Sequence, residues 1–210
     1  MKEIRNIIFD LGGVLLNINY QKTADAFQRL GFEQFNNMYT QYTADEVFSK
    51  LETGKISNED FYETLLSKAT HPISVADLRA AWNAMLLDFR SESLTKLQQL
   101  KQQYQVYLLS NTNDIHWQAF QSIFTESTGE ATIDDYFHKA YYSHQVGLRK
   151  PNADIFEFVA ADAGLERAKT LFIDDSYNNI EAAASLGFQT HLLLEGEKME
   201  TLPYWETIRL

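Results

Sequence analysis

The stretch "FDLGGVLL", from Phe9 to Leu16, decides the fold. It continues an apolar segment rich in isoleucine, Ile4 to Phe9, which is typical of a strand buried on both faces. Asp10 and two glycines follow at the point where this strand would end. Taken alone, "DLGG" is more often an ordinary turn after a strand than a catalytic motif. The role of Asp10 therefore depends on what the rest of the chain brings to the same place.

A long helical insert is predicted between about Tyr20 and Phe89. Gly31 and Gly54 stand where helices would end. Three segments match the capping pattern of a hydroxyl followed three residues later by an acid, and each precedes apolar residues at helical spacing: "TADE" (Thr43 to Glu46), "SNED" (Ser57 to Asp60) and "SVAD" (Ser74 to Asp77). We therefore predict an all-helical block of about 70 residues.

After this block, strand-like and helix-like segments alternate. Strands are expected at 106–111, near 139–143, at 170–175 and at 188–194, with a helix between each pair. This alternation predicts parallel βαβ units. The predicted fold class is α/β, a doubly wound parallel sheet with an inserted helical domain. The predicted core comprises residues 1–16 and 94–210, and the predicted cap comprises residues 17–93.

Composition limits the classes of function. The 210 residues include 18 basic and 29 acidic side chains, a net charge of -11, which argues against a protein that binds the phosphate backbone of nucleic acids. There is no cysteine, which excludes disulfides and thiolate chemistry. No apolar run of about 18 residues and no signal peptide are apparent, so we expect an unprocessed cytoplasmic protein without a membrane partner.

Polar residues gather at the predicted strand ends. In open α/β sheets, ligands bind at the carboxyl ends of the strands. The residues at these ends are Asp10, Ser110, Asn111, Asp174 and Asp175, and Lys150 precedes a predicted helix. Carboxylates within a few Å repel each other by about 4 kcal/mol per pair at an effective dielectric constant of about 20. We therefore expect a divalent cation there, most simply Mg²⁺.

Four motifs in this order carry a family resemblance. "FDLGGVLL", "LLSNTND", "GLRKP" and "FIDDSYNNIEAA" resemble the motifs of the haloacid dehalogenase-like (HAD) hydrolases, and the helical insert stands where that superfamily places its type 1 cap. "DLGGVLLN" and "LETGKISNEDF" are similar to a phosphatase-like branch that includes glucose-1-phosphate phosphatases. The resemblance implies a Mg²⁺-dependent phosphatase of a small phosphorylated metabolite, such as a sugar phosphate, and a monomer or weak homodimer.

The resemblance also implies a role for each motif residue. Asp10 would be the nucleophile that becomes an aspartyl phosphate. Ser110 and the Asn111 amide would hold phosphoryl oxygens, and Lys150 would neutralise charge on the phosphate and on Asp10. The implied metal ligands are Asp10, the carbonyl group of Gly12, Asp175, and Asp174 directly or through water. Asn179 would brace the acidic loop.

Gly12 departs from the family pattern. Most phosphatases of the superfamily carry at this position an aspartate that serves as general acid and base, a contribution worth about 10² to 10⁴ in rate. Three readings stay open: substrates with good leaving groups, a proton supplied by the cap or by water, or a slow phosphatase that mainly binds phosphate. A haloacid-type dehalogenase also lacks this acid, because halide needs no proton. The paired acids at 174 and 175 fit that metal-free chemistry less well.

Overall fold

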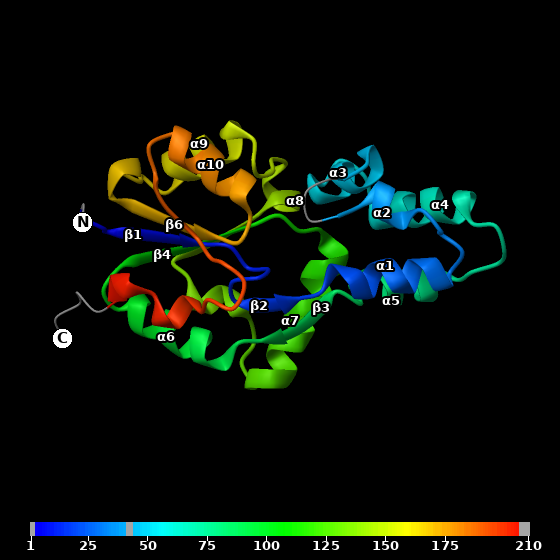
Figure 1. Cartoon of the computed structure of the whole chain (residues 1–210), viewed down its shortest axis with the longest axis horizontal. Helices are drawn as coiled ribbons and strands as arrows, with labels where there is room; N and C mark the ends of the chain where they lie inside the picture. The colour runs from blue at the N-terminus through cyan, green and yellow to red at the C-terminus, as the bar shows by residue number, and fades with distance from the viewer. Residues whose placement is uncertain (1–2, 41–43, 206–210) are drawn as a thin grey trace.

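A parallel sheet forms the centre of the molecule, in a computed structural model that describes residues 3–40 and 44–205 (Figure 1). β1 lies in the middle, hydrogen-bonded to β4 on one side and to β6 on the other. In spatial order the strands are β5 (Lys139–Tyr142), β4 (Gln105–Ser110), β1 (Asn6–Phe9), β6 (Thr170–Asp174) and β7 (Gln189–Leu192). All four pairings are parallel, which confirms the predicted α/β fold class.

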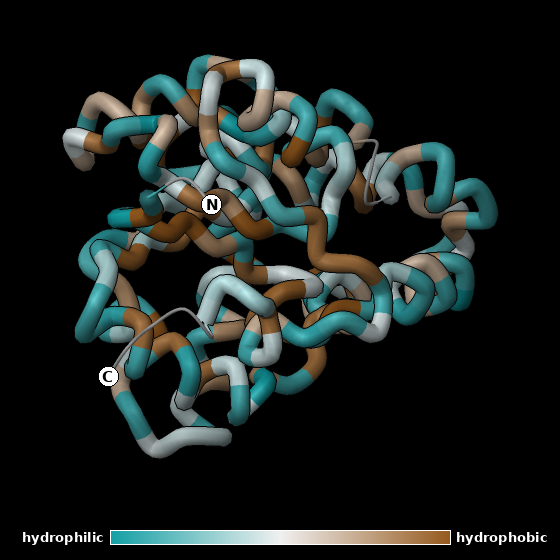
Figure 2. Tube along the Cα trace, turned by 60° about the vertical axis from the view of Figure 1, so that its left-hand side comes forward, coloured by the Kyte–Doolittle hydropathy of each residue, from teal (hydrophilic) through white to brown (hydrophobic). Residues whose placement is uncertain are grey.

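Both faces of the sheet are covered by helices. Successive side chains of a strand point to opposite faces, so Ile7 and Phe9 of β1 join one hydrophobic cluster and Ile8 joins another. α6 (Ser91–Lys101) and α7 (Asp114–Thr128) cover the first face, whereas α9 (Ala153–Asp162) and α10 (Tyr177–Ser185) cover the second. Apolar segments consequently run through the interior in Figure 2, with more hydrophilic segments outside.

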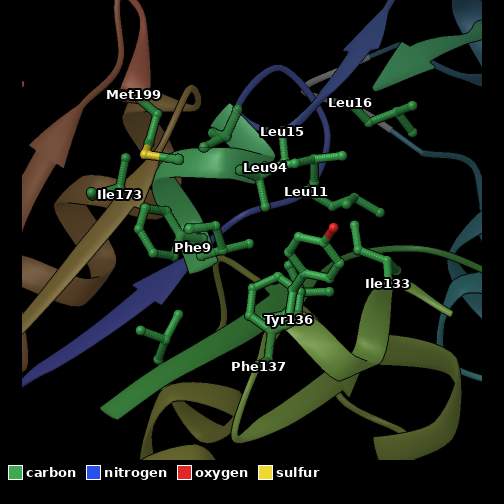
Figure 3. Packing of buried hydrophobic residues seen from close by; sticks show 14 of the residues in the cluster. Phe9, Leu11, Leu15, Leu16, Leu94, Ile133, Tyr136, Phe137, Ile173 and Met199 are labelled. Atoms are coloured by element: carbon green, nitrogen blue, oxygen red, sulfur yellow. The ribbon is translucent and has the colours of Figure 1, made fainter. Parts of the chain in front are cut away.

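The first-face cluster ties the loop after β1 to the core. Figure 3 shows Phe9 and Ile173, from neighbouring strands, packed with Leu94 of α6 and with Met199. Leu11, just after Asp10, is 2% exposed in the same cluster. Apolar packing therefore holds the residues on both sides of Asp10 in place. The remaining short helices are α8 (Ser143–Val146), η1 (Ile133–Tyr136), η2 (Arg167–Lys169), η3 (Met199–Thr201) and η4 (Pro203–Trp205).

The insert after β1 is helical, as predicted, from Tyr20 to Asn83. Its helices are α1 (Tyr20–Arg29), α2 (Phe35–Met38), α3 (Glu46–Glu52), α4 (Asn58–Lys68) and α5 (Val75–Asn83). They pack around the buried Trp82, whose ring contacts Phe27, Phe48 and Phe61. The predicted capping boxes of α4 and α5 are present. Thr43 of the third predicted box lies outside the described residues.

The predicted end of the helical block is wrong. Leu86–Phe89 forms strand β3, which pairs antiparallel with β2 (Leu16–Ile18) in a separate two-stranded sheet. This pair carries the chain into and out of the helical insert. A run of four residues is too short for its spacing to separate strand from helix, so the pattern of α5 was extended too far. The predicted domain boundaries at 16/17 and 93/94 stay predictions. Among residues 3–40 and 44–205, no helix is long and apolar enough to span a membrane.

Candidate active site

Three carboxylates meet at the centre of the sheet edge. Asp10 directly follows β1, and its N–H continues the ladder by donating to the carbonyl of Ile173 (2.9 Å). Asp174 ends β6, and Asp175 follows it. Because β1 and β6 are neighbouring parallel strands, each of these three side chains has an oxygen within 4.8 Å of those of the other two. The chain continues from β1 to β4 and β5 on one side of β1 and then crosses to β6 and β7 on the other side, so the edge between β1 and β6 is the switch point where open α/β sheets bind ligands.

Lys150 bridges two of the carboxylates. Its Nζ lies 2.8 Å from Oδ1 of Asp10 and 2.6 Å from Oδ2 of Asp174, and the side chain is 1% exposed. Burial alone would lower the pKa of Lys150, but the two carboxylates outweigh it and the pKa is raised. Lys150 is therefore a charged ammonium group inside the site.

Asn111 positions this lysine. Its side-chain oxygen accepts from the main-chain N–H of Lys150 (2.9 Å), and its Nδ2 donates to the Lys150 carbonyl (2.8 Å). The Asn111 side chain is thereby committed to the loop that carries Lys150. Ser110, at the end of β4, is 3% exposed and lines the same pocket as Asp10. The structure thus brings both predicted phosphate-binding residues to the site, but it gives the Asn111 side chain a positioning contact.

Asp174 is held from several directions. It accepts from the N–H of Ser176 (2.8 Å), from Nδ2 of Asn179 (3.0 and 3.1 Å) and from Lys150, and it is fully buried. Asn179 therefore contacts the acidic loop as a brace would. Asp10 and Asp175 line the pocket. The burial of Asp174 and its partners favour a contact with the predicted metal through water, whereas Asp10 and Asp175 line the pocket itself and are placed for direct ligation.

The carboxylates are crowded enough to change their titration. Burial, together with Asp174 and Asp175, raises the pKa of Asp10 to about 7, although Lys150 opposes the shift. Burial and the neighbouring Asp174 raise the pKa of Asp175 to about 6. Burying several negative carboxylates together is costly, and a divalent cation bound between them offsets that cost. Carboxylate oxygens are also the hard donors that Mg²⁺ prefers. These residues therefore fit Mg²⁺.

The two glycines of "DLGG" are accommodated for different structural reasons: one by its backbone conformation, the other by a neighbouring side chain. Gly13 has φ 73°, and a Cβ there would collide with the carboxylate of Asp175. Gly12 lines the pocket and has no positive φ, but a Cβ at this position would meet Cδ1 of Ile18. Gly13 thus allows Asp175 to approach the loop, while the side chain of Ile18 in β2 occupies the place where a side chain at position 12 would begin.

Several pocket residues were missed from sequence. The cap contributes Tyr20, Tyr39 and Glu52, and the core contributes Arg149 and His116. Glu52 lies within "LETGKISNEDF" and Arg149 within "GLRKP", both quoted above, but nothing in either motif showed that these residues meet. Only the placement of the cap on the core brings them together.

His116 anchors the cap. Its ring stacks on Trp82 with centroids 4.4 Å apart, Nε2 lies 3.0 Å from the Trp82 carbonyl, and Nδ1 lies 3.2 Å from Nδ2 of Asn113. Burial lowers the pKa of His116 to about 4. The ring is therefore neutral near pH 7 and serves packing between the cap and the core.

A protein-family model for haloacid dehalogenase-like hydrolases matches residues 4–187. The chain belongs to this family. This hydrolase is 33% identical over 189 residues to the D-ribitol-5-phosphate phosphatase of Bacteroides thetaiotaomicron, covering 89% of this chain and 90% of that protein. The predicted family is therefore confirmed, as is the placement among its phosphatases. The finer likeness to glucose-1-phosphate phosphatases stays a prediction.

Solved structures agree with this assignment. A HAD family enzyme of Bacteroides thetaiotaomicron in complex with magnesium and inorganic phosphate has a TM-score of 0.83 and 36% identity, covering 93% of this hydrolase and 97% of that chain. A HAD-like hydrolase of Porphyromonas gingivalis has a TM-score of 0.87 and 33% identity, with 98% and 99% covered. The metal in the first of these complexes is the one predicted here from the acidic cluster.

Proposed function

We propose that this hydrolase is a Mg²⁺-dependent phosphatase that acts on a small phosphorylated sugar or polyol through an aspartyl phosphate on Asp10. The observation that carries the proposal is the buried triad of Asp10, Lys150 and Asp174, with Asp175 alongside, at the switch point of the sheet. The similarity to a D-ribitol-5-phosphate phosphatase supports the substrate class. A cytoplasmic location and a monomer or weak homodimer remain predictions.

The first step forms a bond between Oδ of Asp10 and phosphorus and breaks the bond to the ester oxygen, which leaves with its electron pair. Lys150, 2.8 Å from Asp10, neutralises charge on the nucleophile and on the phosphoryl group. Ser110 and the main-chain N–H of Asn111 hold phosphoryl oxygens, because the Asn111 side chain is engaged with Lys150. Asp10, Asp175 and the Gly12 carbonyl would hold Mg²⁺, which would supply positive charge beside the phosphoryl group. A water oxygen then bonds to phosphorus as the bond to Oδ of Asp10 breaks, which releases inorganic phosphate and restores the Asp10 carboxylate; the proton that this water loses balances the one that the departing alkoxide takes up from solvent.

A catalytically weak phosphate-binding protein is the second candidate. The observation that favours it is the Gly12 position, where Ile18 packs instead of an acid. Under this alternative, phosphate and Mg²⁺ bind but no phosphoester turns over. The dehalogenase alternative has no comparable support, because buried paired acids are not required for halide displacement.

The test is a panel of phosphorylated metabolites assayed with Mg²⁺, together with Asp10→Asn. We expect hydrolysis of sugar or polyol phosphates, its loss in chelator, and a fall in kcat of at least about 10³-fold in Asp10→Asn, because the amide cannot act as the nucleophile. Asp154→Asn, an exposed aspartate of α9, is the matched control. Beryllofluoride should be trapped on Asp10. More than about a tenth of wild-type kcat in Asp10→Asn would contradict the covalent step, since this corresponds to under about 1.4 kcal/mol of barrier.

A further inference from the structure

One charged pair joins the cap to the core inside the active-site pocket. Glu52 ends α3 of the cap, and its Oε2 lies 2.9 Å from Nη2 of Arg149, the core residue next to Lys150. Tyr39 donates from its hydroxyl group to Oε1 of Glu52 (3.0 Å). Glu52, Arg149 and Tyr39 all line the pocket that contains Asp10. The pair thus stands beside the place where the group attached to a bound phosphate must lie.

Backbone packing fixes the position of this pair. Gly54, two residues after Glu52, has φ 63° and lies so close to the carbonyl of His144 that a Cβ would collide with it. The turn that follows α3 therefore sits directly on α8 and on the loop that leads to Arg149. This close approach holds the end of α3 against the core near Arg149, in addition to the attraction between Glu52 and Arg149.

The pair is incompletely hydrogen-bonded. Glu52 is 3% exposed, and its Oε2 has no hydrogen bond of good geometry to any described residue, despite the nearby guanidinium group. Nε of Arg149 is also buried and, within residues 3–40 and 44–205, lacks a hydrogen-bond partner. Burial raises the pKa of Glu52. A buried ion pair is costly unless further hydrogen bonds satisfy its polar atoms. The acceptor Oε2 of Glu52 and the donor Nε of Arg149 both lack such a bond, which indicates that a bound ligand completes the pair.

We propose that Glu52 and Arg149 form a subsite for a hydroxyl group of the substrate's leaving group. A hydroxyl group can donate to the carboxylate of Glu52 and accept from the guanidinium group of Arg149. An alkyl chain can do neither and would leave Oε2 of Glu52 and Nε of Arg149 without a hydrogen bond, and a second phosphate would face the carboxylate. The inference rests on the proposed phosphatase function and makes this pair the determinant that selects polyol or sugar phosphates over alkyl phosphates.

The test compares two substrates of similar size, ribitol 5-phosphate and n-pentyl phosphate, in wild type, Glu52→Gln and Arg149→Lys. We expect the ratio of their kcat/KM values to favour the polyol in wild type and to fall by about 10- to 100-fold in both variants, mostly through KM of the polyol. Glu46→Gln, an exposed glutamate on the same helix, should keep the wild-type ratio. Thermal unfolding checks that each variant is folded.

The outcomes separate this inference from the function on which it rests. If kcat/KM falls by the same factor for both substrates in both folded variants, the pair of Glu52 and Arg149 only docks the cap and the inference is wrong. The inference also fails, with the phosphatase function intact, if wild type hydrolyses both substrates at the same kcat/KM. If wild type hydrolyses neither substrate, the proposed phosphatase function is wrong for these substrates. The subsite still stands in that case if ribitol 5-phosphate raises the Tm of wild type more than n-pentyl phosphate does and Glu52→Gln removes the difference.

Discussion

Ile18 packs against Gly12 at the point where a side chain at position 12 would begin. The contact is made by Cδ1, the far end of a flexible side chain in β2. An acid at position 12 therefore requires Ile18 to change its rotamer or to be shortened. The side chains that positions 12 and 18 can carry are therefore sterically coupled.

This relationship predicts the outcome of restoring the acid. Gly12→Asp alone should lower the free energy of unfolding by about 1–2 kcal/mol through overpacking, and Ile18→Ala in the same chain should relieve that crowding while adding its own cavity cost. The double variant should raise kcat for an alkyl phosphate by about 10-fold or more, and less for an aryl phosphate, because only the poor leaving group needs the proton. Equal changes for the two substrates would show that another group already transfers the proton.

Gly13 should be required for metal binding. Gly13→Ala places a Cβ against the Asp175 carboxylate at a residue with φ 73°. Gly187→Ala is the control, since Gly187 has φ 90° but nothing within 4 Å of an added Cβ. Both variants should lose about 1–2 kcal/mol of stability from backbone strain. Only Gly13→Ala should weaken Mg²⁺ binding at least about 10-fold by calorimetry, and equal Mg²⁺ affinities in the two variants would contradict this role.

Replacing Lys150, the buried ammonium group between Asp10 and Asp174, should lower the stability of the protein as well as its activity. Lys150→Met leaves Asp10 and Asp174 buried beside each other without their common partner, which should lower the free energy of unfolding by about 3–5 kcal/mol. Lys139→Met breaks a half-exposed pair with Asp162 and should cost at most about 1 kcal/mol. Denaturant unfolding at pH 7.5 measures both. Similar losses in the two variants would show that burial of the triad is not what makes Lys150 important.

The stability of the metal-free protein should fall between about pH 4 and pH 7. In that range the unfolded chain has ionised Asp10 and Asp175, whereas the folded protein retains protons because their pKa values are about 7 and about 6. The folded state then binds more protons, so the free energy of unfolding decreases as pH rises. Tm measured in chelator at pH 5 and pH 7.5 tests this. Asp175→Asn should flatten the dependence, and a Tm that rises with pH through the titration of these groups would refute it.

Sequence patterns predicted the parts of the site that depend on strand ends. Asp10, Ser110 and Asp174 each end or follow a buried apolar run, and parallel strands bring such ends to one edge. The contact of Glu52 with Arg149 could not be predicted, because it depends on how the insert docks. The packing of Ile18 on Gly12 depends on the pairing of β2 with β3, and β3 was itself taken for helix. Local sequence patterns therefore located Asp10, Asp174 and Asp175, while the docking of the cap on the core determined the rest of the pocket.

The β2–β3 pair has a consequence for how this architecture can be altered. Ile18 and Leu86 are register partners, so the two points where the chain enters and leaves the insert lie across one strand spacing, about 5 Å. Leu16 and Phe89 at the other end of the ribbon pack into the core of the sheet domain. The antiparallel pair of β2 and β3 therefore belongs to the core at one end and carries the helical insert at the other end. A tight turn, or another helical module, could be grafted at the same two positions without re-routing a single strand of the parallel sheet.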